Sequence, residues 1–164
     1  MRVLLKSCLL LLPLFATMAW AADDADGVLG NWLTADGKAR VEVVKHGDSY
    51  DGSIVWLKQP TYTAQDQEGV PGQPKVDLKN PDKALQNRPI IGLALMSGFK
   101  YAGDNVWTDG HIYDPERGKL YSCKITLMMD GSLKVRGYWG VSLFGETRIW
   151  TRPPADTPVP ASKP

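Results

Sequence analysis

Three aspartates that lie close together in the sequence, Asp104, Asp109 and Asp114, have the side chains best suited to acid–base chemistry. Glycosidases place two carboxyl groups on either side of the bond that they cleave, so this cluster raises the possibility of sugar hydrolysis. However, Asp104 lies in a Gly-Asp-Asn segment and Asp114 precedes Pro115. Aspartates in such positions commonly accept hydrogen bonds from nearby backbone amides in tight turns. We therefore favour a turn role and predict no catalytic residue.

Other catalytic and metal-binding patterns are equally weak. The chain has two histidines, His46 and His111, neither in a recognisable triad, and it has no Gly-x-Ser-x-Gly motif. With so few histidines and no Cys-x-x-Cys pair, a zinc site is not predicted. The segments 103–105 and 130–131 lack the alternating oxygen ligands of a calcium loop. We predict neither a metal nor a cofactor.

Aromatic and arginine side chains form a more informative set. Arginine beside aromatic rings suits a ligand that has a carboxylate or sugar hydroxyls and an apolar body. The alternative, which we favour for the rings as a group, is cross-strand packing within a core. Arg136 and Tyr138 alternate with Leu133, Val135 and Trp139, so their face of the strand is predicted to meet solvent. The candidate ligand-binding residues are Trp56, Arg88, Trp107, Tyr113, Tyr121, Arg136 and Tyr138.

These side chains lie on a series of short β-patterns joined by turn signals. Alternating or β-rich runs cover 30–34, 39–43, 50–57, 105–113, 119–129, 132–140 and 146–152, whereas 89–99 fits either a buried strand or a short helix. An antiparallel meander of about eight strands can close as a barrel or pack as a sandwich. We favour an up-and-down barrel, because its connections are local and closure removes exposed edges.

One long loop interrupts the meander. Residues 58–87 contain four prolines and cannot form a central strand, and a loop of this length is usually functional or mobile. We expect one helical turn over 81–86, capped by Asn80. Asp77 and Asn80 are the predicted anchors that hold this loop over one mouth of the barrel.

The N-terminal segment has the three parts of an export signal: Arg2 and Lys6, the apolar run 9–15, and the small-x-small site 19–21. We predict a signal peptide over 1–21, one β-barrel domain over 22–152 and a disordered Pro-rich tail over 153–164. Export predicts a periplasmic or secreted protein. Removal of the signal lowers the basic count from 19 to 17, against 18 acidic residues, so nucleic acid and anionic membranes are poor partner candidates. The mature chain retains Cys123 as its single thiol, which we predict to be buried and inert.

The ends of the meander resemble those of lipocalins and related calycin barrels. Gly30-Asn31-Trp32 starts the first strand, and Trp150-Thr151-Arg152 ends the last. In those families the tryptophan of Gly-x-Trp plugs the closed end, and a basic residue of the final strand covers it. The resemblance implies that Trp32 is the plug and Arg152 its cover, with Arg148 as the other candidate.

A second resemblance covers nearly the whole mature chain. Ordered sequence blocks are similar to those of the exported bacterial family known as domain of unknown function 2147. That family implies a calycin-like barrel and supplies no established activity. The blocks include Gly30-x-Trp32, Ile54-Val55-Trp56-Leu57, Asp77-x-x-Asn80-Pro81, Gly103-Asp104-Asn105-x-Trp107, Gly110-x-Ile112-Tyr113-Asp114-Pro115, Val135-Arg136-Gly137-Tyr138 and Trp150-x-Arg152.

Two functions of different classes follow from this sequence. The first is a non-catalytic binding module whose barrel takes a small amphipathic or apolar ligand at the mouth away from Trp32. The second is a filled barrel that acts through its outer surface as a protein-interaction or structural factor of the cell envelope. An enzyme acting at the barrel mouth is a third alternative, because unrelated folds can gain catalytic sites. An empty interior favours the first function and a packed interior the second.

Overall fold

The computed structural model describes residues 24–140 and 145–154. In this part of the chain, one antiparallel sheet has eight strands, and each strand pairs with the next along the sequence. The strands are β1 (Gly30–Leu33), β2 (Ala39–His46), β3 (Ser49–Leu57), β4 (Ala94–Tyr101), β5 (Val106–Asp114), β6 (Lys119–Leu127), β7 (Leu133–Tyr138) and β8 (Gly145–Trp150). A short 3-10 helix, η1 (Lys83–Leu85), lies between β3 and β4. The prediction of an all-β up-and-down meander is confirmed.

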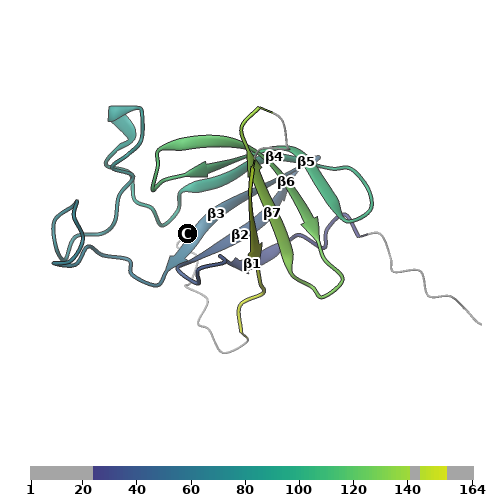
Figure 1. Ribbon diagram of the computed structural model, residues 1–164, viewed down its shortest axis with the longest axis horizontal. Helices are drawn as coiled ribbons and strands as arrows, with labels where there is room; N and C mark the ends of the chain where they lie inside the picture. The colour runs from purple at the N-terminus through teal and green to yellow at the C-terminus, as the bar shows by residue number, and fades with distance from the viewer. Residues whose placement is uncertain (1–23, 141–144, 155–164) are drawn as a thin grey trace, which may run out of the picture.

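The sheet curls into a barrel-like wall (Figure 1), and Leu33 at the end of β1 bridges to Thr151, the residue that follows β8. Leu33 N–H donates to the Thr151 carbonyl at 2.7 Å, and Thr151 N–H donates to the Leu33 carbonyl at 3.1 Å. This isolated bridge lies just beyond the end of β8 and joins the two ends of the sheet. Because β1 has only four residues, the pairing does not continue along the rest of β8.

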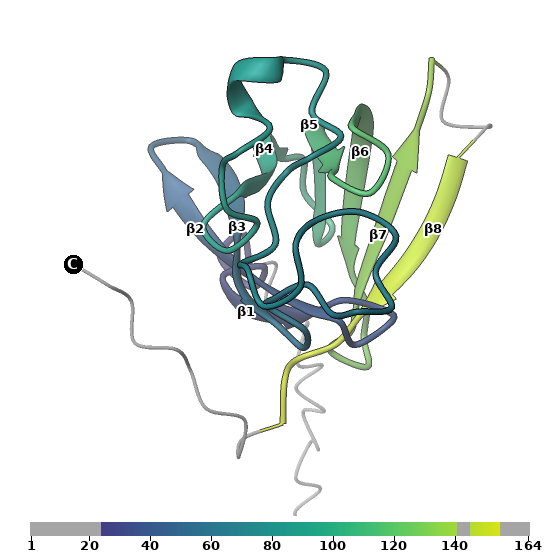
Figure 2. The same ribbon diagram turned by 90° about the vertical axis from the view of Figure 1, so that its left-hand side faces the viewer.

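The meander gives the barrel two different ends. The turns 46–49, 101–106 and 127–133 lie at the end where β1 begins, which we call the closed end. The opposite end, which we call the open rim, carries the turns 34–38 and 114–119 and the loop from 58 to 93. Figure 2 shows this long loop in front of the strands, over the open rim.

Large side chains fill the closed-end half of the barrel. Trp32, Phe99 and Trp107 have no exposed surface, and Met96 and Ile125 are 1% exposed. This packing requires glycine at position 110, because the Phe99 ring occupies the space that a Cβ on Gly110 would need. The packed half therefore supplies the buried apolar surface that stabilises a domain of this size.

Cys123 lies within this core on β6 and is fully buried. It is a free thiol, and burial raises its pKa to about 12. The thiolate that would react with oxidants or electrophiles is therefore disfavoured at neutral pH.

Two details differ from the sequence-based expectations, and a third agrees with them. The segment 89–99 is not one element: β4 begins only at Ala94, because the backbone of residues 89–92 hydrogen-bonds to the long loop and to β3. The helical turn is shorter than expected, and its cap is Asp82 instead of Asn80, with the Asp82 side chain accepting the Ala84 N–H. Asp104 lies in a tight turn at φ 52°, as the turn interpretation predicts.

The predicted signal peptide over 1–21 and most of the tail over 153–164 lie outside the described residues. Among the residues that the structure does describe, no helix is both long and apolar enough to cross a membrane.

Candidate functional site

A cavity of about 1200 Å³ lies beneath the long loop at the open rim. Ligand sites for small molecules commonly have volumes of roughly 300–1,000 Å³, so this space can hold a small organic ligand together with water. Its walls come from both ends of the sequence, since turn 34–38, the long loop and β8 all contribute side chains. The barrel is thus filled at one end and hollow at the other.

The floor of the cavity is apolar. Strand alternation turns Ile54, Leu95, Ile112 and Val135 toward the interior, and Trp150 lies beside them at the end of β8. Ile54, Val135 and Trp150 are each less than 5% exposed. Ile112 is only half-buried, so an apolar ligand body that contacts it would remove apolar area from water.

The wall contains a position without a side chain. Gly137 on β7 lines the cavity, and a Cβ added there would be 3.6 Å from Ile112 Cγ2 and 3.8 Å from Tyr121 Cβ. Those are ordinary van der Waals distances, so the backbone at Gly137 has room for a side chain. The glycine therefore contributes to the empty volume.

Asp77 holds the long loop to the barrel wall. Its carboxylate is fully buried and accepts hydrogen bonds from Tyr113 Oη at 2.8 Å, Asn80 Nδ2 at 2.8 Å and Arg88 Nη2 at 2.9 Å. Arg88 also places its Cζ 5.7 Å from the centre of the Tyr113 ring. A buried carboxylate needs such partners, since an unpaired buried charge is costly. The structure thus joins the two predicted loop anchors, Asp77 and Asn80, to two of the candidate ligand contacts, Arg88 and Tyr113.

Tyr113 connects this anchor to the cavity, which it also lines. Burial, followed by the hydrogen bond to Asp77, raises the pKa of the Tyr113 phenol to about 12. The Tyr113 phenol therefore keeps its proton and donates a hydrogen bond to Asp77 throughout the neutral pH range, so it is not a candidate general base there.

The turn between β5 and β6 fits closely against the loop. At Gly118, φ is +64° and a Cβ would stand 1.8 Å from the Lys79 carbonyl oxygen. Glycine is required there both by the left-handed conformation and by the approach of the loop backbone. Asp114 shapes the same turn by accepting the N–H groups of Glu116 and Arg117. Its placement agrees with the turn interpretation of this aspartate.

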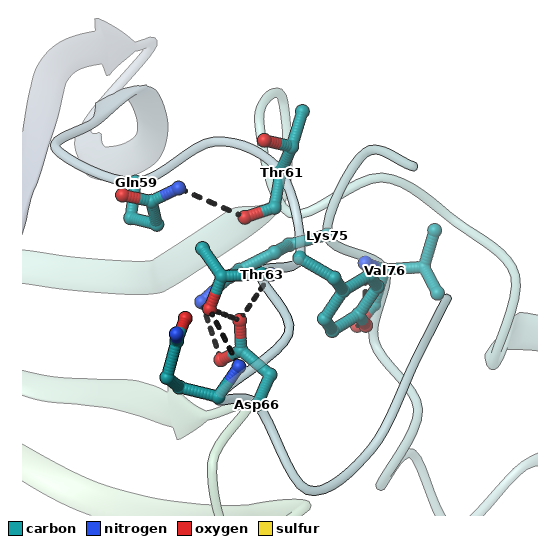
Figure 3. Close-up of polar contacts among 8 residues, drawn as sticks. Gln59, Thr61, Thr63, Asp66, Lys75 and Val76 are labelled. Carbon is teal, nitrogen blue, oxygen red and sulfur yellow. Dashed lines mark hydrogen bonds and ion pairs between the residues drawn. The ribbon is translucent and has the colours of Figure 1, made fainter. Parts of the chain in front are cut away.

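A second set of contacts shapes the outer part of the loop (Figure 3). Asp66 accepts hydrogen bonds from the Thr63 N–H at 2.6 Å and hydroxyl at 2.9 Å, and Lys75 Nζ lies 3.2 Å from its other oxygen. These three donors lower the pKa of the Asp66 carboxyl. Tyr62 Oη both donates to the Val76 carbonyl and accepts from its N–H, each at 3.2 Å. The loop is therefore a folded cover with its own internal bonds.

Charged side chains of both signs surround the cavity entrance, and most are paired with one another. The ion pairs are Lys38–Asp36, Lys75–Asp66, Lys79–Glu68, Arg117–Asp114 and Arg148–Glu146. The rim has no excess of one sign, so it favours no net ligand charge. It offers hydrogen-bonding groups above an apolar floor, which is the arrangement expected for an amphipathic ligand.

Tyr121 and Tyr138 also line the cavity. The Tyr121 ring meets that of Trp139 edge to face, with ring centres 6.3 Å apart, and Trp139 is 72% exposed at the rim. Together with Tyr113, three of the seven predicted ligand contacts therefore border the cavity.

Three other candidates lie elsewhere. Trp107 is fully buried in the closed-end core, where its ring packs against Tyr50 and Tyr101. Trp56 packs near the Arg40 guanidinium, whose Cζ is 5.6 Å from the ring centre, and does not border the cavity. Arg136 donates to the Thr147 hydroxyl on the neighbouring strand and also lies off the cavity. The structure thus places Trp56, Trp107 and Arg136 away from the cavity, because periodicity identifies a strand face but not its height in the barrel. Arg88, which anchors the loop, does not border the cavity either.

At the closed end, the structure brings Trp32 and Arg152 together. The Arg152 Cζ lies 3.7 Å from the centre of the Trp32 ring, and the indole N–H donates to the Val28 carbonyl at 2.7 Å. The guanidinium also donates to the carbonyls of Leu29 at 2.7 Å and Gly27 at 2.8 Å. Arg148, the other candidate cover, lies instead at the open rim.

Sequence reasoning missed the apolar floor of the cavity. Those side chains, Ile54, Leu95, Ile112, Val135 and Trp150, look like ordinary core residues in the sequence. One available signal was Gly137, a residue without a side chain within a strand, since glycine in a strand often marks close approach or open space.

No group of three or more His, Cys, Asp or Glu side chains in the described residues is arranged to hold a metal ion. The arrangement can enclose, desolvate and orient a small molecule.

Comparisons with known proteins agree with this architecture. Protein HP1028 from Helicobacter pylori, described as belonging to the lipocalin family, has a similar structure with a TM-score of 0.63. The two chains are 21% identical, and the match covers 78% of this chain and 84% of that one. Functionally curated proteins gave no match. The sequence profile of the family described as "Uncharacterized protein conserved in bacteria (DUF2147)" matches residues 30–152. The chain therefore belongs to the DUF2147 family, and its fold is that of a lipocalin-like barrel.

Proposed function

We propose that this protein is an exported, non-catalytic binding module that takes a small amphipathic or apolar ligand into the open-rim cavity. The observation that carries the proposal is the contrast between a packed closed end and a cavity of about 1200 Å³ under a folded loop. The apolar floor would hold the ligand body, and the polar groups of the rim would face its head. A barrel packed along its whole length, the alternative considered from the sequence, would have no such space.

Binding can be tested by filling the cavity from within. In Gly137→Leu, the new Cβ meets ordinary contacts. We expect the rest of the side chain to project into the cavity, because Gly137 lines it on the same strand face as Val135. We expect this variant to lower the affinity for a fluorescent amphiphile such as 1-N-phenylnaphthylamine by about tenfold or more, since loss of ~1.4 kcal/mol of binding energy has that effect. Fluorescence titration measures the affinity, and thermal melting checks that the barrel still folds.

The matched control is Gly137→Ala, which adds only a methyl group and should bind nearly as the parent does. Equal binding by the parent and the leucine variant would show that the probe binds outside this cavity. Absence of binding to the parent across lipids, small acids and apolar probes would contradict the proposed function.

Export is part of the proposal and rests on residues 1–21, which have the pattern of a cleavable signal. We expect the protein recovered from cells to begin after Ala21 or Ala22 and to appear in the periplasmic or secreted fraction. Intact mass measurement after cell fractionation tests this. A cytoplasmic protein that retains Met1 or Arg2 would contradict it.

A further inference from the structure

The half of β8 that lies near the open rim has an unpaired edge. The β7–β8 register runs without a shift from Leu133↔Trp150 to Tyr138↔Gly145, so backbone direction alternates regularly along β8. Thr151 points both its N–H and its C=O at Leu33, away from β7. Ile149, Thr147 and Gly145 follow at intervals of two residues, and their backbone groups therefore point to that same side.

Nothing in the described part of the chain pairs with those three residues. The chain leaves β1 at Leu33 and turns through 34–38 into β2, so no β1 backbone lies beside this stretch of β8. All five residues from 145 to 149 are exposed. An exposed edge of this kind is a template for another strand, and proteins normally cover, shorten or charge such edges.

The side chains on this edge are complementary to themselves. Glu146 and Arg148 are two residues apart on the cavity-facing side and form an ion pair at 2.5 Å within the chain. If two copies of β8 pair antiparallel about Thr147, Glu146 of each lies opposite Arg148 of the other. Opposite charges at directly opposed positions stabilise an antiparallel pair.

The backbone selects the same register. Pairing about Thr147 sets Thr147 against the partner's Thr147, and Gly145 against the partner's Ile149. These are the residues with outward-pointing backbone groups, so each pair exchanges N–H and C=O bonds. Centring on Glu146 or Arg148 would instead oppose like charges and present backbone groups that already bond to β7. Ile149, which is 45% exposed, would be partly covered in the Thr147-centred register.

We infer that β8 is a self-association edge, through which two copies of this protein form a two-fold symmetric dimer by antiparallel β8–β8 pairing centred on Thr147. The second β8 also extends the wall of each cavity, because Glu146 and Arg148 line both the edge and the cavity. One pair of short strands buries less surface than a standard interface of about 1,600 Å², so the dimer is expected to be weak.

Proline at position 147 separates edge pairing from folding. The Thr147 N–H points away from β7, so Thr147→Pro removes no bond of the β7–β8 ladder but blocks the edge. Thr147→Val is the matched control: it also loses the hydroxyl that accepts from Arg136 but keeps the N–H. By analytical ultracentrifugation of the exported chain up to about 1 mM, we expect the parent and the valine variant to dimerise, and the proline variant to have a dissociation constant at least about tenfold higher.

Charge exchange provides a test that does not depend on proline. Glu146→Lys and Arg148→Glu should each weaken self-association, because in each variant positions 146 and 148 carry charges of the same sign and repel their counterparts in the second copy. An equimolar mixture of the two variants should form a heterodimer, and the double variant E146K/R148E should recover the parent's dimer. The inference is overturned if the parent is monomeric at every concentration, or if the proline variant dimerises as the parent does. It is also overturned if the Glu146→Lys and Arg148→Glu variants fail to associate when they are mixed. The inference would also be overturned if the protein were isolated as a monomer whose β8 edge pairs with a peptide from another protein. Ligand titration of the Thr147 variants reports on the cavity separately, because Thr147 does not line it.

Discussion

Replacing Trp32 with alanine is expected to lower the free energy of unfolding by about 3–5 kcal/mol, the usual cost of truncating a large buried aromatic residue. The indole is fully buried, carries the Arg152 guanidinium on its face and bonds to the Val28 carbonyl. Its loss would open the closed end of the core. Such a loss is a large fraction of the 5–15 kcal/mol that typically stabilises a domain. Urea denaturation measures the effect.

Two comparisons make this expectation specific. Trp139→Ala also removes an indole, but Trp139 is 72% exposed, so its stability should change by less than about 0.5 kcal/mol. Arg152→Lys keeps the charge but loses the planar stack and the forked bonds to Gly27 and Leu29, so we expect a loss of about 1–2 kcal/mol. If Trp32→Ala melts like the parent, the closed end does not stabilise the barrel as described.

Replacing Asp77 with alanine should release the long loop from the barrel wall. The carboxylate is fully buried and joins Tyr113, Asn80 and Arg88, so its removal leaves a guanidinium and a half-buried phenol without their acceptor. We expect a loss of about 3–4 kcal/mol, near the lower end of the range for breaking a buried ion pair because Arg88 is partly exposed. Hydrogen exchange should increase most over residues 75–93, where the backbone bonds of the loop depend on this anchor.

Glu68→Ala is the control for this prediction, since Glu68 is an exposed acid on the same loop whose ion pair with Lys79 is solvent-accessible. Surface ion pairs contribute about 0–1 kcal/mol, so its stability should change little. Unchanged exchange over residues 75–93 in Asp77→Ala would show that the loop is held by other contacts.

The order of strands was predictable because each hairpin is encoded locally. Asp36-Gly37 and Gly47-Asp48 mark turns between alternating runs, and such signals depend little on distant residues. The start of the strand within 89–99 could not be predicted in the same way, because a continuous apolar run has no periodicity that marks where a strand begins. Tertiary bonds from residues 90 and 92 to Lys75 and Ile54 determine where β4 begins.

The candidate site was predictable only in part. Asp77, Arg88 and Tyr113 could be identified individually, but the sequence does not show that one carboxylate joins them, since that contact spans 36 residues. Trp107 and Tyr121 have similar sequence patterns, yet one lies in the core and the other borders the cavity. Their positions along the barrel axis, which depend on sheet register and bulges, make the difference.

The central claim is that the hollow half of the barrel is a ligand site, and methyl NMR of the exported protein with a saturating amphiphile tests it most directly. The account predicts that the largest chemical-shift changes occur at Ile54, Leu95, Ile112 and Val135, which form the apolar floor, while Ile125 in the packed half changes little. Shift changes confined to outward-facing methyl groups such as Ile149, or none at any ligand concentration, would contradict the claim.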